Sequence, residues 1–186
     1  ACGIGSGVTA YGGSAAGPGV APCDAGVFHA YHGPRAAFFD LSFADSVGGR
    51  EDIFDLIRHV TETKKSELVL LTNATLFEGK RLEEVKTLDR EGVKFQVSLD
   101  GTSPEINDPI RGKGVFEKAS SGLRALSALG FETSLTAAVT RSNLKDLETL
   151  PALARELGAK AVHLMWLHKR GRILETDGEA AFPDAT

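Results

Sequence analysis

The chain has 186 residues, a formal net charge of −4 and 42% hydrophobic residues, which fits one soluble globular domain. The acidic balance and the lack of a basic tract disfavour a nucleic-acid partner. No apolar run approaches the ~20 residues of a membrane span, and no secretory signal pattern opens the chain, so we expect a cytoplasmic protein with no membrane partner.

The first segment, residues 1–35, is rich in glycine and poor in helix-forming residues, which predicts irregular structure with at most a hairpin. It holds both cysteines of the chain, Cys2 and Cys23. Two thiols permit a single disulfide, two free thiols or a share in a metal site. His29 and His32 would complete a zinc set only across an unusually long gap between the cysteines.

From residue 36 the sequence becomes regular, with apolar residues alternating at strand spacing and then recurring at helical spacing. Gly92, Gly130 and Gly158 follow three of the helical stretches, and Pro151 divides the last one or lies near its start. We expect strands at 36–43, 67–71, 94–99, 133–139 and 161–167, and helices at 51–63, 79–90, 115–129 and 143–157.

Strands that alternate with helices indicate βαβ units and a parallel sheet. A closed eight-stranded barrel usually needs ~250 residues, so five strands cannot close one. The predicted fold class is therefore α/β, a partial (βα) barrel with an open parallel sheet. We assign it to residues 36–175, with residues 176–186 as a tail.

The stretch 97–116 is the most informative part of the chain. Strand-like alternation ends abruptly at Asp100-Gly101, and a loop rich in carboxylates, proline, arginine and glycine precedes the helix that starts near Val115. Loops at the carboxyl ends of parallel strands carry the ligand contacts in barrels and open α/β sheets. This loop is therefore the first candidate for a polar ligand site.

Similar polar motifs follow the other strands in order. Thr72-Asn73 ends one strand, Ser98-Leu-Asp100-Gly ends the next, and Arg111-Gly-Lys-Gly, Asn143 and the Lys169-Arg-Gly-Arg stretch follow. This succession resembles the radical S-adenosylmethionine (AdoMet) enzymes, in particular the branch with a C-terminal SPASM extension that matures peptides and proteins. The resemblance covers roughly residues 36 to 175.

The resemblance implies six cofactor-contacting residues, each at or just beyond a strand end: Thr72, Asn73, Ser98, Asp100, Arg111 and Asn143. Ser98 and Asp100 would lie near the ribose or methionine portion of AdoMet, and Arg111 would contact its carboxylate or order the loop. These side-chain types suit a ligand that has a carboxylate, an ammonium group and a ribose diol.

Enzymes of this family also hold a [4Fe–4S] cluster on a C-x3-C-x2-C loop, and this chain has no such loop. The family's Gly-Gly-Glu-Pro motif is replaced by residues 44–47, Ala-Asp-Ser-Val. Cys2 and Cys23 resemble a fragment of the SPASM segment and are the candidate metal ligands. We therefore expect this chain to be inactive unless another segment or chain supplies the cluster.

The implied function is that of a radical AdoMet oxidoreductase or maturase, or a fragment of one. It would act on a peptide or small-molecule substrate through a 5′-deoxyadenosyl radical, with a reductant such as ferredoxin or flavodoxin. Two alternatives remain: a non-catalytic scaffold with a degenerate barrel, and a metal-independent α/β enzyme that uses Asp100 and Arg111 on a phosphorylated substrate. On the last strand, His163, Met165 and Trp166 are most simply core residues.

Overall fold

The structure, a computed structural model, describes residues 31–32, 36–40, 53–63 and 67–166. It contains one six-stranded sheet whose strands follow each other in chain order, β1-β2-β3-β4-β5-β6. β1 pairs antiparallel with β2, and β2 to β6 are all parallel. The strands are β1 (Tyr31–His32), β2 (Ala36–Asp40), β3 (Glu67–Thr72), β4 (Val93–Ser98), β5 (Glu132–Val139) and β6 (Ala161–Trp166).

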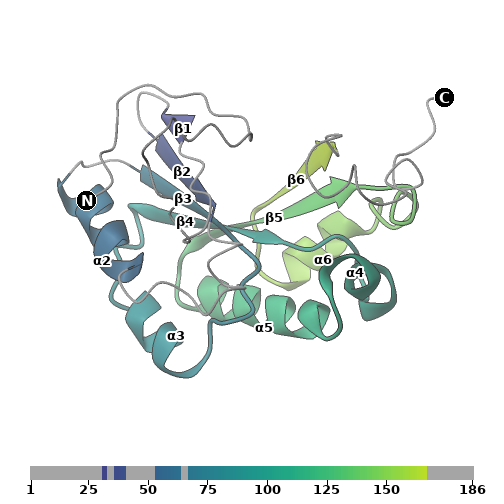
Figure 1. Ribbon diagram of the computed structural model, residues 1–186, viewed down its shortest axis with the longest axis horizontal. Coiled ribbons are helices and arrows are strands. Elements are labelled where there is room, and N and C mark those ends of the chain that lie inside the picture. The colour runs from purple at the N-terminus through teal and green to yellow at the C-terminus, as the bar shows by residue number, and fades with distance from the viewer. Residues whose placement is uncertain (1–30, 33–35, 41–52, 64–66, 167–186) are drawn as a thin grey trace, which may run out of the picture.

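The described helices lie on one face of this sheet, and the sheet curves away from them so that β2 and β6 rise on either side of β4 (Figure 1). They are α2 (Ile53–Arg58), which continues into the π-helical turn η1 (His59–Thr63), then α3 (Gly79–Val85), α4 (Pro104–Arg111), α5 (Val115–Ala128) and α6 (Leu150–Glu156). This is an open partial barrel, and the predicted fold class is confirmed.

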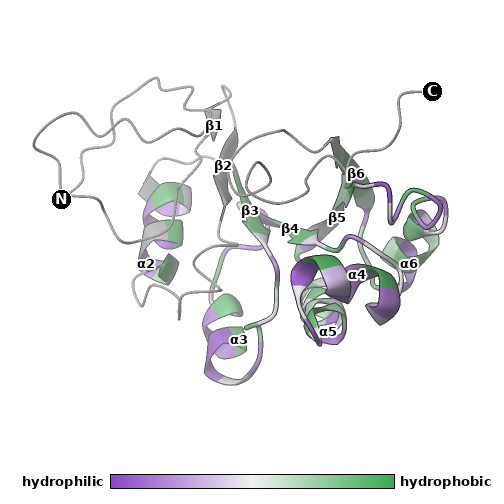
Figure 2. Ribbon diagram, turned by 45° about the vertical axis from the view of Figure 1, so that its right-hand side comes forward, coloured by the Kyte–Doolittle hydropathy of each residue, from purple (hydrophilic) through white to green (hydrophobic). Residues whose placement is uncertain are grey.

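The hydrophobic core fills the layer between the sheet and the helices. Phe95 on β4 lies at its centre, with its ring edge-on to Phe77 at 5.6 Å and to Phe131 at 5.2 Å between centroids. Leu123 and Leu126 of α5 are fully buried beside it. The helices carry both hydrophobic and hydrophilic residues (Figure 2), as expected for helices with one face on a sheet.

The largest difference from the sequence prediction is α4, which forms inside the stretch expected to be a polar loop. Ser103 has an extended backbone at the N-cap, with φ −145° and ψ 162°. Pro104 follows at the first helical positions, where its fixed φ suits a helix and its missing N–H costs nothing. Pro109 lies within the same helix and misleads the prediction, because proline usually ends helices.

Other helices are shorter than expected. α3 ends at Val85 and not at residue 90, and α6 starts at Leu150, so residues 141–149 form turns. Pro151 lies in the first turn of α6 and does not divide a longer helix. The predicted segments 1–30, 41–52 and 167–186 lie outside the described residues.

The interpretation of the β6 side chains as core is wrong. His163 is exposed, and the exposed fractions of Met165 and Trp166 are 45% and 68%. In the part of the chain that the structure describes, β6 pairs only with β5. Apolar residues in a strand show that a face can be covered, but they do not identify the segment that covers it.

Candidate functional site

The candidate site lies at the carboxyl ends of β3, β4 and β5, where the three loops expected from the sequence come together. Thr72 pairs with Val97, and Ser98 pairs with Thr136, so β3 and β4 end within one residue of each other and β5 continues to Val139. Their loops therefore leave the sheet at one edge, the edge that binds ligands in open parallel sheets.

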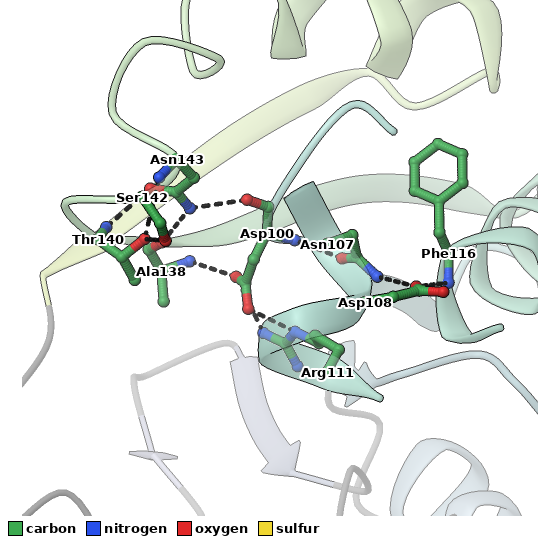
Figure 3. Close-up of polar contacts among 9 residues, drawn as sticks. All are labelled: Asp100, Asn107, Asp108, Arg111, Phe116, Ala138, Thr140, Ser142 and Asn143. Atoms are coloured by element: carbon green, nitrogen blue, oxygen red, sulfur yellow. Dashed lines mark hydrogen bonds and ion pairs between the residues drawn. The ribbon is translucent and has the colours of Figure 1, made fainter. Parts of the chain in front are cut away.

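Asp100 is the centre of the polar network at this edge (Figure 3). Its side chain is 2% exposed, and both carboxylate oxygens accept hydrogen bonds. Arg111 donates from Nε to Oδ2 at 2.6 Å and from Nη2 to Oδ1 at 3.2 Å, and the Ala138 amide donates to Oδ1 at 2.7 Å. The carboxylate thus joins β4, α4 and β5 and has no open face for a ligand.

Arg111 is the accessible partner of this pair, with a side chain that is 23% exposed. Arginine has five N–H donors, and Asp100 accepts from two of them. The remaining donors make no hydrogen bond among the described residues, and the buried carboxylate fixes the position of the guanidinium. Such a bidentate, charge-assisted pair orients the guanidinium more precisely than a single contact would.

Asn143 is fully buried and bonds to backbone groups of several segments. Its Nδ2 donates to the carbonyls of Asp100 and Ala138, both at 2.7 Å, and its Oδ1 accepts from the Thr140 amide at 2.8 Å. Both polar atoms of this side chain are hydrogen-bonded to backbone groups, so Asn143 holds the loop after β5 against the loop after β4.

The residues just before Arg111 form the second half of the network. Asn107 accepts a hydrogen bond from the Asp100 amide at 2.9 Å, and Asp108 accepts from the amides of Phe116 at 2.9 Å and Gly114 at 2.6 Å. The hydrogen bond from Phe116 is the main cause that lowers the pKa of Asp108. Asp108 of α4 therefore caps the first turn of α5 from outside that helix.

Thr72 and Asn73 order their own loop. Thr72 accepts a hydrogen bond from the Ala74 amide at 3.0 Å, and Asn73 accepts from the Thr75 amide at 3.0 Å and the Thr75 hydroxyl at 2.8 Å. Thr72 is buried and Asn73 is half-buried. These contacts place the Asn73 amide group at the end of β3, beside the end of β4 but outside the Asp100 network.

Ser98 is 7% exposed and lies at the end of β4, where it pairs with Thr136 on the neighbouring strand β5. Gln96 and Thr136 are not among the residues predicted for the site, yet these two buried side chains are hydrogen-bonded to each other across β4 and β5. The alternation of polar and apolar residues in β4 was the available signal. It predicted a strand, but it did not identify Thr136, which lies diagonally across from Gln96 on β5, as the hydrogen-bond partner of Gln96.

A metal site of the expected kind is not found among the described residues, where no group of three His, Cys, Asp or Glu side chains can hold an ion. The two candidate ligands, Cys2 and Cys23, lie outside that part of the chain. Within the same described ranges, no helix is long and apolar enough to cross a membrane.

Residues 42–154, more than half of the chain, match the family model of the Radical SAM superfamily. The chain belongs to this superfamily. An AdoMet-dependent heme synthase of Methanosarcina barkeri is 33% identical over 129 residues, which cover 69% of this chain and 36% of the relative. The mycofactocin maturase MftC of Mycolicibacterium smegmatis is 44% identical over 68 residues, which cover 36% of this chain and 17% of the relative.

Solved structures show the same fold. Streptococcus suis SuiB superposes with a TM-score of 0.56 at 16% identity, over 64% of this chain and 27% of that chain. The structure of anSMEcpe with bound AdoMet gives 0.53 at 16% identity, over 74% and 40%. This chain spans about a third of the length of the first curated relatives.

Members of the superfamily use AdoMet and a [4Fe–4S] cluster. The strand-end residues suit AdoMet, because Arg111 offers guanidinium donors and Ser98 and Asn73 offer neutral polar groups. The residues do not suit the cluster: these 186 residues include two cysteines, and the family loop needs three.

Proposed function

We propose that this chain is the AdoMet-binding part of a radical AdoMet oxidoreductase or maturase that acts on a peptide or small-molecule substrate. The observation that carries the proposal is the buried Asp100, which holds a partly exposed Arg111 at the carboxyl edge of the sheet. The relatives named mycofactocin maturase and subtilosin biosynthesis protein support the reaction class.

In this proposal Arg111 binds the AdoMet carboxylate, and Ser98 and Asn73 contact the ribose or methionine portion. Bound AdoMet supplies a 5′-deoxyadenosyl radical in this superfamily. Asp100 acts on the ligand through Arg111, because its own oxygens already accept three hydrogen bonds. Asn143 and Thr72 keep the loops in register and are positioning residues.

The reduction of AdoMet is not assigned to these residues, since the cysteine ligands of the family cluster are not complete among them. A reductant such as ferredoxin or flavodoxin and a further segment or chain with cluster ligands complete the proposed enzyme. The roles of Cys2 and Cys23 as auxiliary cluster ligands remain part of the same proposal.

Isothermal titration calorimetry of the 186-residue chain with AdoMet and S-adenosylhomocysteine tests the proposal. We expect both ligands to bind, and we expect Arg124→Ala to bind them as the wild type does, because Arg124 pairs with Glu156 on the helical side. Inorganic phosphate serves as a competitor. Phosphate binding without AdoMet binding would support the phosphorylated-substrate enzyme and contradict the proposal.

A further inference from the structure

A second contact, in addition to those of Asn143, joins the loop after β4 to the loop after β5. Both carboxylate oxygens of Asp146 accept hydrogen bonds from Thr102, whose amide donates to Oδ2 and whose hydroxyl donates to Oδ1, each at 2.5 Å. The Asp146 amide in turn donates to the Asn143 carbonyl at 2.9 Å. This Thr102–Asp146 clamp therefore ties together two loops of the candidate site that are 44 residues apart in the chain.

The clamp lies at the start of α4. Thr102 directly precedes Ser103, the N-cap residue of α4, whose own side chain makes no capping hydrogen bond. Asp146 thus places a carboxylate from another loop beside the amino end of the helix, where the helix dipole stabilises negative charge. Thr102 and Asp146 are both half-buried, and hydrogen bonds to an ionised carboxylate are stronger than those between neutral groups. The start of α4 is therefore held by a contact that its local sequence does not supply.

Arg111 ends the same helix. α4 has eight residues, and a helix this short is not stable by itself, so contacts with other segments fix its position. Asp100 holds the middle and the end of α4 through Asn107 and Arg111 (Figure 3). The Thr102–Asp146 clamp holds its start. A shift of that start therefore moves the Arg111 guanidinium relative to the sheet.

We propose, resting on the function proposed above, that Asp146 is a positioning residue for AdoMet binding. Through Thr102 and α4 it keeps Arg111 in the orientation that receives the AdoMet carboxylate. Asp146 acts through the helix and not on the ligand, because both of its carboxylate oxygens already accept hydrogen bonds from Thr102. Glu148 provides the contrast: it is an exposed carboxylate in the same turns and makes no hydrogen bond or ion pair among the described residues.

The test measures the affinities of Asp146→Ala for AdoMet and for decarboxylated AdoMet by isothermal titration calorimetry. We expect the affinity for AdoMet to fall about 3- to 10-fold, because the carboxylate no longer meets a correctly placed guanidinium. Decarboxylated AdoMet, which lacks that carboxylate, should bind within about twofold of its wild-type affinity. The loss of a negative charge alone predicts the reverse order, because decarboxylated AdoMet carries one more net positive charge than AdoMet.

Three further variants separate positioning from a general effect on the fold. Thr102→Val removes the hydroxyl donor and should cause a smaller loss that is again specific to AdoMet, while Thr102→Ser keeps both donors and should bind as the wild type does. Glu148→Ala, the matched control, removes a carboxylate from the same turns and should leave both affinities within about twofold. In an Arg111→Ala background, Asp146→Ala should cause no further loss of AdoMet affinity, because the group that it positions is gone.

A measurement on the ligand-free protein makes the clamp testable without AdoMet. In Asp146→Ala the solvent-exchange rate of the Arg111 Nε–H, measured by NMR, should rise at least about threefold, because α4 is less firmly held. The Ala138 amide, which donates to the same Asp100 carboxylate, should keep its rate.

Equal losses for the two ligands, a larger loss for decarboxylated AdoMet, or unchanged affinities would overturn the role of Asp146. An absence of AdoMet binding by the wild type would contradict the proposed function and, with it, the positioning of Arg111 for AdoMet. In that case a raised Arg111 exchange rate would still support the clamp as the contact that fixes α4. An unchanged Arg111 rate would overturn the clamp whatever the ligand.

Discussion

At the residue scale, Asp100, which the sequence resemblance implies is a cofactor contact, is a buried carboxylate that binds Arg111 and the Ala138 amide. Its residue type and strand-end position were readable from the sequence. Its partners were not, because Arg111 returns to it only through α4, and the Ala138 amide lies 38 residues further along the chain. A buried carboxylate with three donors stabilises the loops around it, and in our proposal the ligand contact belongs to Arg111.

Replacement of Asp100 by asparagine should therefore lower stability. The neutral amide cannot accept from Arg111 and Ala138 as the carboxylate does, and its own N–H groups would face those donors. We expect a loss of about 2–3 kcal/mol in the free energy of unfolding, measured by urea titration. Asp55→Asn, which breaks an exposed pair with Arg58, should cost less than about 1 kcal/mol. Equal losses in the two variants would contradict the role of Asp100.

Asp108 gives a pH-dependent prediction. Hydrogen bonds from the amides of Phe116 and Gly114 hold its pKa below the usual value of 3.8. A lowered folded-state pKa means that the stabilisation is complete above the unfolded-state pKa and is lost as the pH falls through the folded-state pKa. The stability advantage of wild type over Asp108→Asn should thus be constant near neutral pH and shrink below about pH 4.

Urea unfolding of both proteins between pH 6 and pH 2 measures this difference. Glu148→Gln in the turns before α6 is the control, since this exposed carboxylate makes no hydrogen bond or ion pair among the described residues. An advantage of wild type that grows toward acid would contradict the assigned cap.

At the element scale, the strands were more predictable than the helices. Alternation in β4 and β5 and the apolar run in β3 identified the strands to within a residue or two, because one face of each is a continuous core. α4 was missed because its stability comes from Asn107, Asp108 and Arg111, whose partners lie elsewhere in the chain. Local propensity does not record such contacts.

The packing of α5 on the loop after β3 is a second feature of this scale. A Cβ atom placed on Gly122 would lie 2.2 Å from the Ala74 carbonyl oxygen. Ala74 itself has φ 55°, a left-handed conformation that fixes the course of the Thr72–Asn73 loop. The absence of a side chain at Gly122 therefore lets the helix support the loop.

Gly122→Ala should destabilise the protein by about 1–3 kcal/mol because the new methyl group meets backbone. The same change at an open helical position would stabilise it by up to about 1 kcal/mol. Thermal and urea unfolding measure whether Gly122→Ala lowers or raises the stability, with Ser121→Ala as the neighbouring control. A Gly122→Ala protein that is more stable than wild type would contradict the close approach.

At the scale of the whole molecule, the open sheet brings strand-end residues to one edge. The sequence predicted the open parallel sheet and its polar edge, since both follow from strand order and residue type. It did not predict the Gln96–Thr136 pair, because the two residues are 40 positions apart and meet only through the β4–β5 register. The fold is that of the superfamily to which the chain belongs, and the proposed AdoMet binding is tested by a direct binding measurement.

The most direct measurement is a double-mutant-type cycle of binding affinities. Isothermal titration calorimetry gives the affinities of wild type and Arg111→Ala for AdoMet and for decarboxylated AdoMet. The account predicts that the substitution weakens AdoMet binding about 10- to 100-fold, as expected for a lost charge-assisted hydrogen bond. Decarboxylated AdoMet should bind both proteins within about twofold, since it lacks the group that Arg111 holds. Equal losses for the two ligands, or no AdoMet binding by the wild type, would contradict the account.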